Sequence, residues 1–332
     1  MKILVYLPRP LGAAVLSIPF LRALQDNFPA SQISLVTNEK FDPFFRTILP
    51  EYSQIPLPEI KDIPRLKTAS SRLKKMGFDV GILLDDSFPS ALLFYLARIP
   101  DRWGYDREGR GFMLTRRMSI KATDPQLHLK DYYLNILNKL GLKVEDKDSR
   151  LHLPEDCLSR ASEKLKQAGL NLEKPIIAVK PGSSYGRARV WPVDHQIELI
   201  KKLADLSVQV ILIGSAASQE VSQKISARLD GRVVDLSGQI SLQEIPGIIA
   251  KARIYLGNDS GLTHLANFLG VPVVGLYGPT DPQVCGPVRQ PSVVLKKPVP
   301  CSPCSYKTCP YDHRCLNNIT VEEVLQAISA YL

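Results

Sequence analysis

Short apolar runs and amphipathic stretches alternate along the first half of the chain. Runs rich in Ile, Leu and Val are followed by segments whose apolar residues recur at helical spacing. This pattern predicts strands at 3–7, 32–38 and 79–85 and helices at 14–27, 43–48, 90–99 and 129–141. Alternation of strand and helix with short connections is typical of a parallel sheet with helices on its faces.

A second alternating series follows a charged connector at 143–175. Its predicted strands are 176–182, 208–214, 232–238, 253–259 and 271–278. A chain of 332 residues is long for a single hydrophobic core. We therefore expect an α/β protein with two Rossmann-like domains, 1–168 and 169–332, that face each other across a cleft.

The chain carries a formal net charge of +9, from 42 Lys and Arg against 33 Asp and Glu. Such an excess suits a nucleic acid, an anionic membrane surface or a phosphorylated substrate. No zinc-finger, RRM or KH signature accompanies the scattered basic residues, so nucleic acid is not an expected partner. The apolar run at 3–7 is too short for a signal-peptide core, and no run of about 18 apolar residues could span a bilayer. We expect a cytoplasmic protein.

The predicted strands of the second half end in glycine-containing turns, where open α/β sheets bind their ligands. The first turn, KPGSSYGRARVWP (180–192), combines the hydroxyls of Ser183 and Ser184 with the charges of Arg187 and Arg189. Small hydroxyl residues, glycines and arginines at a strand end suit a diphosphate. The alternative is a solvated basic loop.

The second turn lies in GNDSGLTHLANFLG (257–270). The backbone amides of Ser260 and Gly261 stand at the start of a predicted helix and can hold an anion, with Asp259 before them and His264 further along. Alternatively, Asp259 caps this helix and His264 is a packed residue.

The third turn, GSAASQE (214–220), places Glu220 near the start of a predicted helix. A carboxylate at such a position can accept both hydroxyls of a ribose, although it is also favourable there without a ligand. Together, the three turns predict a nucleotide-diphosphate pocket in the second domain.

These motifs resemble the ADP-heptose:lipopolysaccharide heptosyltransferases of glycosyltransferase family 9, and most closely its heptosyltransferase II members. The resemblance runs in order over nearly the whole chain. It is carried by LGAAVLSIPFLRAL, DDSFPSALLFYLARIPDRWGYDREGRGFMLT, HLKDYYLNILNKLG, PGSSYGRARVWP, NDSGLTHLANFLGVPVVGLYGPTDP and CSPCSYKTCPYDHRCLNNIT.

The resemblance implies a GT-B fold with the acceptor in the first domain and the nucleotide-sugar donor in the second, which ends in a closing helix at 320–332. The implied reaction transfers heptose from ADP-heptose, with inversion, to the inner core of lipopolysaccharide. The acceptor would be an anionic glycolipid of the lipid A/Kdo type, reached by peripheral contact with the inner face of the inner membrane. The resemblance implies no need for a cofactor or a divalent metal, and the absence of a DxD sequence from the donor half agrees with this.

The resemblance also assigns residues to roles. Arg189 stands where the family usually has a Lys that neutralises the departing ADP, and its guanidinium keeps that charge. The implied acceptor-binding residues are Gly12, Arg107 and Arg110. The implied donor-binding residues are Ser183, Ser184, Arg189, Glu220, Asp259, Ser260, Gly261 and His264.

The first turn of the chain departs from the family pattern. The family has Leu-Gly-Asp there, and its Asp is the general base, whereas this chain has Ala13. A positioned base contributes typically about 10²–10⁴-fold to such a reaction. Either the base has moved to Asp86, with Asp85 and Glu108 as other carboxylates of the region, or turnover is slow, or the acceptor or sugar differs. A non-catalytic nucleotide-sugar binding protein and a transferase for another nucleotide sugar are the alternatives.

Four cysteines gather near the end of the chain, beside His313. They could form a tetrahedral zinc site, one or two disulfides, or a set of free packed thiols. The spacing is irregular for paired zinc knuckles, so no metal is the expectation. The four are Cys301, Cys304, Cys309 and Cys315.

Overall fold

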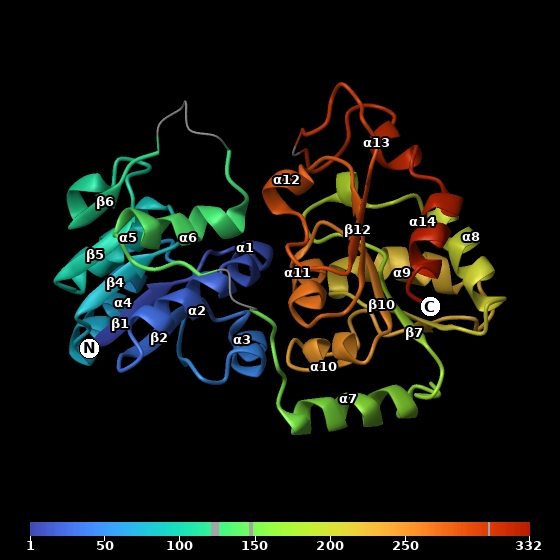
Figure 1. The fold of residues 1–332 in the computed structure, drawn as a ribbon, viewed down its shortest axis with the longest axis horizontal. Helices are drawn as coiled ribbons and strands as arrows, with labels where there is room; N and C mark the ends of the chain where they lie inside the picture. Colours follow the sequence, from blue (N-terminus) through green and yellow to red (C-terminus); the bar gives the residue numbers. More distant parts are fainter. Residues whose placement is uncertain (121–125, 146–148, 305) are drawn as a thin grey trace. The chain divides into compact units, whose positions relative to one another are not determined.

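The computed structural model describes residues 1–120, 126–145, 149–304 and 306–332, and the chain divides into two compact units (Figure 1). The units are Met1–Ser149 and Arg150–Leu332, so they meet ahead of the expected boundary at 168–169. The helix between these two positions, α7 (Glu155–Gln167), packs against α10 (Ile245–Ala250). It therefore belongs with the second unit rather than with the connector.

The first unit contains a six-stranded sheet in which all neighbouring strands are parallel. Its strand order is β3-β2-β1-β4-β5-β6. The chain reverses direction across the sheet between β1 and β4, and the loops that follow these two strands define the switch point where ligands bind. The strands are β1 (Lys2–Tyr6), β2 (Gln32–Asn38), β3 (Ser53–Leu57), β4 (Val80–Leu83), β5 (Asp101–Tyr105) and β6 (Arg116–Met118).

Helices cover this sheet on both faces. Helices α4 and α5 pack against each other, and so do α2 and α6. The helices are α1 (Leu11–Leu16), α2 (Ile18–Asn27), α3 (Asp42–Ile48), α4 (Ile63–Met76), α5 (Phe88–Leu96) and α6 (Leu129–Lys139), with a 3-10 turn η1 (Gly111–Met113).

The expected single helix at 14–27 is two helices in the structure. Helix α1 begins already at Leu11, and it meets α2 at Ser17, whose Oγ donates to the carbonyl of Ala14 (2.7 Å). Pro19 lies in the first turn of α2, where its missing N–H costs no intrahelical hydrogen bond. Proline therefore favours a new helix start at this place over an uninterrupted helix.

The second unit repeats the same topology. Its order, read from the β9 edge as β9-β8-β7-β10-β11-β12, again has the first strand in the third place, and the sheet is parallel throughout. All five strands expected here are present, and β12 is an additional edge strand. The strands are β7 (Ile176–Lys180), β8 (Gln209–Leu212), β9 (Val234–Asp235), β10 (Ile254–Asn258), β11 (Val273–Tyr277) and β12 (Ser292–Lys296).

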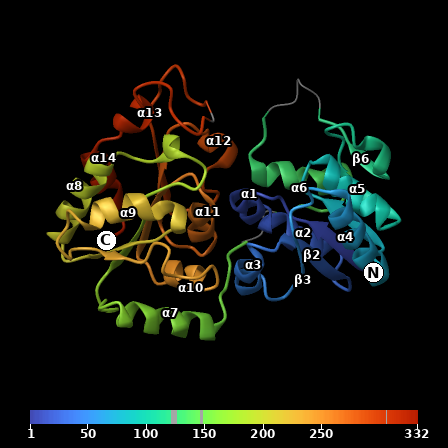
Figure 2. The ribbon, with the colours of Figure 1, turned by 180° about the vertical axis from the view of Figure 1, so that it is seen from behind.

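The helices of the second unit also cover both faces. Helix α8 packs against α9 and α14, and α10 packs against α11 (Figure 2). The expected closing helix is α14, which begins at a capping box between Thr320 and Glu323. The remaining elements are α8 (Val193–Ala204), α9 (Gln219–Ser226), α11 (Gly261–Phe268), α12 (Pro282–Cys285), α13 (Arg314–Asn317), α14 (Val321–Ser329), η2 (Arg187–Arg189) and η3 (Ala216–Ser218).

The predicted α/β fold class with two Rossmann-like domains is confirmed in each unit. None of the described helices has the length and hydrophobicity that a bilayer-spanning segment requires.

The packing of α5 on the first sheet can be tested at Gly81. An ideal Cβ at this position would lie 2.5 Å from Cδ2 of Phe94, whose side chain is fully buried. Since the ring cannot move without disturbing the core, we expect Gly81→Ala to lower the free energy of unfolding by about 1–3 kcal/mol in urea denaturation. In a Phe94→Leu background the clash disappears, so the double variant should lose less than the sum of the single losses. Additive losses would contradict this contact.

Candidate active site

In the second unit, the strongest charge interaction at the carboxyl ends of the strands joins Arg189 and Asp259. Arg189 lies in η2, and Asp259 directly follows β10. Nη1 of Arg189 lies 2.9 Å from Oδ2 of Asp259 and also donates to the Asp259 carbonyl (3.2 Å). The side chains are only 17% and 9% exposed, so the pair is largely withdrawn from water. The ring of Tyr185 lies on the other side of the guanidinium, 4.0 Å from its carbon.

His264 completes this cluster from α11. Its side chain is buried, and its Nε2 lies 3.6 Å from Oδ1 of Asp259. Burial alone raises the pKa of Asp259, but the hydrogen bond and charge of His264 and the charge of Arg189 outweigh it, so the pKa lies below its ordinary value. Asp259 is therefore a carboxylate at neutral pH.

Two polar side-chain atoms of this cluster are buried without a hydrogen-bond partner among the described residues. They are Nδ1 of His264 and Nε of Arg189. A buried polar atom without a partner carries a free-energy cost of about 1–3 kcal/mol, and ligand sites are a common place for it. The predicted alternative that Asp259 caps α11 is wrong, because Ser260 is the cap residue and accepts from the amide of Thr263.

The other predicted donor-binding residues lie on neighbouring loops. A Cβ on Gly182 would meet the Cα of Ser218 at 2.9 Å, so the loop after β7 lies directly on the loop after β8. Ser183 is half-buried and accepts from the amide of Tyr185, whereas Ser184 is exposed.

Glu220 opens α9, and its carboxylate is exposed to solvent. It pairs with Arg187, whose Nη2 lies 3.0 Å from both carboxylate oxygens, and with Lys224 at 2.9 Å. The charges and hydrogen bonds of Lys224 and Arg187 lower the pKa of Glu220. A ligand that contacts this carboxylate would either displace these surface ion pairs or bind beside them.

The cysteine-rich segment 301–315 braces the loop that carries Arg189. The Lys307 carbonyl accepts from the amide of Ala188 (3.0 Å), and Nε2 of His313 lies 2.6 Å from the Ala188 carbonyl. All six cysteines are free thiols. Within the described residues, no three His, Cys, Asp or Glu side chains are arranged to hold a metal ion.

In the first unit, the position of the expected base is occupied by a methyl group. Ala13 and Gly12 lie in the first turn of α1, at the end of the loop that follows β1, and both are half-buried. The nearest candidates for a replacement carboxylate follow β4, which pairs with β1 through Tyr6 and Leu83.

Three carboxylates were expected as possible replacements, and two of them cap α5. Asp85 is buried and accepts from the amide of Ser87 (3.0 Å), and Glu108 accepts from the amide of Phe88 (3.1 Å). Asp86 is held by the side chains of Arg110 and Tyr132, and it remains 34% exposed. It therefore combines a fixed orientation with access to a ligand.

Two side chains hold Asp86 in place. Nη2 of Arg110 donates to Oδ1 (3.0 Å), and the hydroxyl of Tyr132 donates to Oδ2 (2.5 Å). The Tyr132 ring stacks on Tyr105 at a centroid distance of 4.3 Å. Burial raises the pKa of Asp86 more than Tyr132 and Arg110 lower it. A carboxylate with a raised pKa and fixed orientation is suited to accept a proton.

Arg110 was expected to contact the acceptor, but it is completely buried. Its guanidinium donates to the carbonyls of Tyr105 and Ser87 as well as to Asp86. Its side chain therefore positions Asp86 and has no exposed surface with which to contact a ligand. Arg107, the other expected contact, is exposed, and its charge acts on Asp86.

Residues 67–314 match the sequence model of glycosyltransferase family 9 (heptosyltransferase). It is 30% identical over 309 residues to lipopolysaccharide heptosyltransferase 2 of Escherichia coli K12, covering 89% of this chain and 88% of that one. Lipooligosaccharide heptosyltransferase 2 of Campylobacter jejuni serotype O:6 is 26% identical, covering 99% and 98%. The solved structure of E. coli ADP-heptose lps heptosyltransferase II superposes with a TM-score of 0.86 at 28% identity, covering 100% and 98%.

The chain belongs to glycosyltransferase family 9. The predicted family, the GT-B class of the fold and the predicted enzyme class are therefore confirmed, and the protein is a heptosyltransferase of this family.

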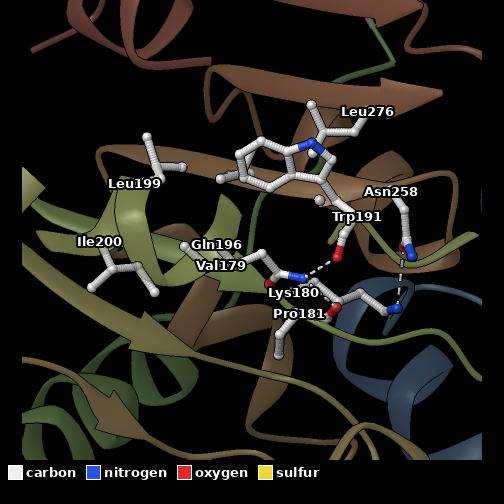
Figure 3. Close-up of a pocket in the computed structure, with 11 residues that line it drawn as sticks. Val179, Lys180, Pro181, Trp191, Gln196, Leu199, Ile200, Asn258 and Leu276 are labelled. Atoms are coloured by element: carbon white, nitrogen blue, oxygen red, sulfur yellow. Dashed lines mark hydrogen bonds between the residues drawn. The ribbon is translucent and has the colours of Figure 1, made fainter. Parts of the chain in front are cut away.

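Lys180 is a residue of this heptosyltransferase site that sequence reasoning missed. Its buried Nζ donates to the Gly182 carbonyl (2.5 Å) and to Oδ1 of Asn258 (3.3 Å), as Figure 3 shows for the second contact. Nδ2 of Asn258 in turn donates to the carbonyls of Gly182 (3.2 Å) and Arg189 (2.8 Å). Lys180 and Asn258 thus tie the start of the loop after β7, at Gly182, to the end of the same loop, at Arg189. The only signal in the sequence is a lysine that ends an otherwise apolar strand.

Lys180 makes stability depend on pH in an identifiable window. Burial, helped by the charge of Arg189, lowers its pKa to about 8, against roughly 10.4 in an unfolded chain. Between these values the unfolded chain holds a proton that the folded chain has lost, so the free energy of unfolding rises with pH, by at most about 1.4 kcal/mol per unit from this group. Below the folded pKa, the destabilisation is present in full.

We expect Lys180→Met to remove this rise. The measurement is urea unfolding of both proteins at several pH values from about 7 to about 10, across the window set by the two pKa values. Lys201→Met, at an exposed lysine of α8, is the control and should leave the wild-type dependence intact. Parallel curves for wild type and Lys180→Met would contradict the lowered pKa of Lys180.

Proposed function

We propose that this heptosyltransferase transfers heptose from ADP-heptose to the inner core of lipopolysaccharide. The largely buried Arg189–Asp259 pair, with unpartnered polar atoms of Arg189 and His264 in the same cluster, is the observation that carries the proposal. The names of the relatives support it, since they specify ADP-heptose, lipopolysaccharide and lipooligosaccharide. The acceptor in this proposal is an anionic glycolipid of the lipid A/Kdo type, reached by peripheral contact with the cytoplasmic face of the inner membrane.

On the donor side, the leaving ADP gains negative charge as the glycosidic bond breaks. Arg189 supplies fixed positive charge for it, and the first amides of α11, after Ser260, add donors at the positive end of a helix. Ser183 and Ser184 would contact the phosphates, and Glu220 would accept from the ribose hydroxyls. Because the protein supplies the compensating charge itself, we propose that transfer requires no divalent metal and no cofactor.

On the acceptor side, Asp86 would take the proton of the attacking hydroxyl. Arg110 and Tyr132 fix its two oxygens, so the carboxylate needs no reorientation before the proton moves. Attack by an acceptor held in the first domain on a donor held in the second displaces ADP in a single step, and a single displacement inverts the anomeric centre.

The donor assignment predicts a loss of ADP affinity when the guanidinium is removed. We expect Arg189→Ala to weaken ADP binding in calorimetry by roughly tenfold or more, the equivalent of about 1.4 kcal/mol, and Arg189→Lys to retain part of the affinity. Arg228→Ala removes an exposed arginine of the same unit, paired with Asp194, and should bind ADP like wild type. EDTA should not change these affinities. Equal ADP binding by wild type and Arg189→Ala would overturn the donor site.

The base assignment predicts the effect of moving a carboxylate. We expect Asp86→Asn to lower the rate of ADP release by roughly 10²–10⁴-fold, with ADP affinity unchanged, because the proton then lacks an acceptor. Ala13→Asp in the Asp86→Asn background should restore part of this rate. Asp131→Asn, which changes a half-exposed carboxylate on the same helix as Tyr132, is the control and should retain the wild-type rate.

Two other results would favour the second candidate functions. ADP binding without turnover by wild type or Ala13→Asp, with any acceptor, would identify a non-catalytic nucleotide-sugar binding protein, which the methyl group of Ala13 makes a specific alternative. Tighter binding of UDP or GDP than of ADP would identify a transferase that uses another nucleotide sugar.

A further inference from the structure

Helix α5 presents an apolar face to solvent. Its sequence, FPSALLFYL, contains no charged residue, and one side of it is buried in the core of the first unit through Ala91, Leu93 and Phe94. An exposed helix of a globular protein ordinarily has polar residues on its outer side. Here the outer side is apolar as well, so the helix has more hydrophobic surface than the core of its own unit covers.

The exposed apolar residues of the helix and the half-buried Leu92 fall on one stripe. They follow the i, i+4, i+7, i+8 spacing of a single helical face. Phe112 of η1, which is 71% exposed, extends the stripe, since its ring lies 6.3 Å from that of Phe88. We call this surface the α5 face; it consists of Phe88, Leu92, Tyr95, Leu96 and Phe112.

The segment that carries the α5 face has more arginines than acidic residues. Between residues 88 and 118 the sequence has six arginines and three acidic residues. Arg102 lies over the ring of Tyr95 at 5.4 Å, and Arg98, Arg107 and Arg117 are exposed. A contiguous apolar surface rimmed by positive charge marks an interaction site, and its complement is an apolar layer beneath a negatively charged surface.

We propose that the α5 face is the surface by which this protein docks on an anionic phospholipid membrane. The aromatic and leucine side chains enter the boundary between headgroups and acyl chains, and the arginines contact the phosphates. Each basic residue near such a surface is worth about 1 kcal/mol, and aromatic rings with a polar edge suit this boundary.

The position of the face agrees with the proposed acceptor, and in this respect the inference rests on the proposed function. Asp86 is separated from the first residue of α5 by Ser87 alone, and Glu108, which caps α5, lies in the loop between Arg107 and Arg110. Docking through α5 thus places the proposed base beside the headgroup layer, where the sugar of a membrane-anchored glycolipid lies.

The experiment measures sedimentation of the full chain with sugar-free vesicles of phosphatidylcholine, with and without phosphatidylglycerol. We expect binding to the phosphatidylglycerol vesicles that weakens with added salt. Leu96→Ser/Phe112→Ser should reduce the partition by roughly tenfold or more, and Arg98→Gln/Arg117→Gln should reduce binding to the anionic vesicles selectively. Ile63→Ser, at a 66% exposed apolar residue of α4 outside the face, is the matched control and should bind like wild type.

Three outcomes would overturn the docking surface: no vesicle binding by wild type, unchanged binding by Leu96→Ser/Phe112→Ser, or a change in self-association of that variant in place of vesicle binding. The last would identify a second copy of the chain as the occupant. ADP affinity and the rate with a lipid-free acceptor sugar should be unchanged in every variant of the face, which also shows that the variants are folded. If wild type neither binds ADP nor reacts with the lipid-free acceptor sugar, that result counts against the proposed function. The vesicle measurement tests the docking surface separately.

Discussion

The donor half of this enzyme depends on holding positive charge out of water. Lys180 ends β7 and Arg189 lies in the loop that follows it, and the carboxylate of Asp259, directly after the neighbouring strand β10, interacts with both charges. Withdrawing such groups from water is costly, and the cost is offset only where hydrogen bonds and opposite charge meet each group. Asn258 and the loop carbonyls provide those hydrogen bonds, so four polar side chains join the loop after β7 to the loop after β10. The charges do not balance within it, and a bound diphosphate would supply the missing anion.

The acceptor half solves a related problem with a different set of residues. A carboxylate that is to accept a proton must be kept partly dehydrated, yet it must not be neutralised by a tight ion pair. Arg110 divides its hydrogen bonds between Asp86 and backbone carbonyls, and burial raises the pKa of Asp86 above its ordinary value although Tyr132 and Arg110 lower it. The methyl group of Ala13 removes the carboxylate that the family pattern has in the first turn, and Asp86 is what the neighbouring strand end offers in its place.

The sequence pattern was informative where burial follows from periodicity. The buried strands of both units could be predicted from apolar runs, whereas β3, β5, β6 and β12 were missed because they are short or carry polar and charged residues such as those of Arg116–Met118. Side-chain roles were harder to predict. Arg110 and Arg107 are alike in sequence and opposite in exposure, and Asp85, Asp86 and Glu108 differ in burial and in hydrogen-bond partners. Such distinctions depend on contacts between segments remote in the chain, as does the burial of Lys180.

The brace between the cysteine-rich segment and the loop of Arg189 has a consequence for biosynthesis. His313 and Ala188 are 125 positions apart, and the Lys307 carbonyl closes the same contact. During synthesis from the N-terminus, β7 and its loop therefore leave the ribosome long before the residues that hold η2 in place. Contacts of such long range form late because the intervening chain must first be closed into a loop. The second unit thus acquires its final geometry around η2 only after synthesis has passed His313, and a nascent chain that has already folded its first unit cannot yet hold Arg189 as the finished protein does.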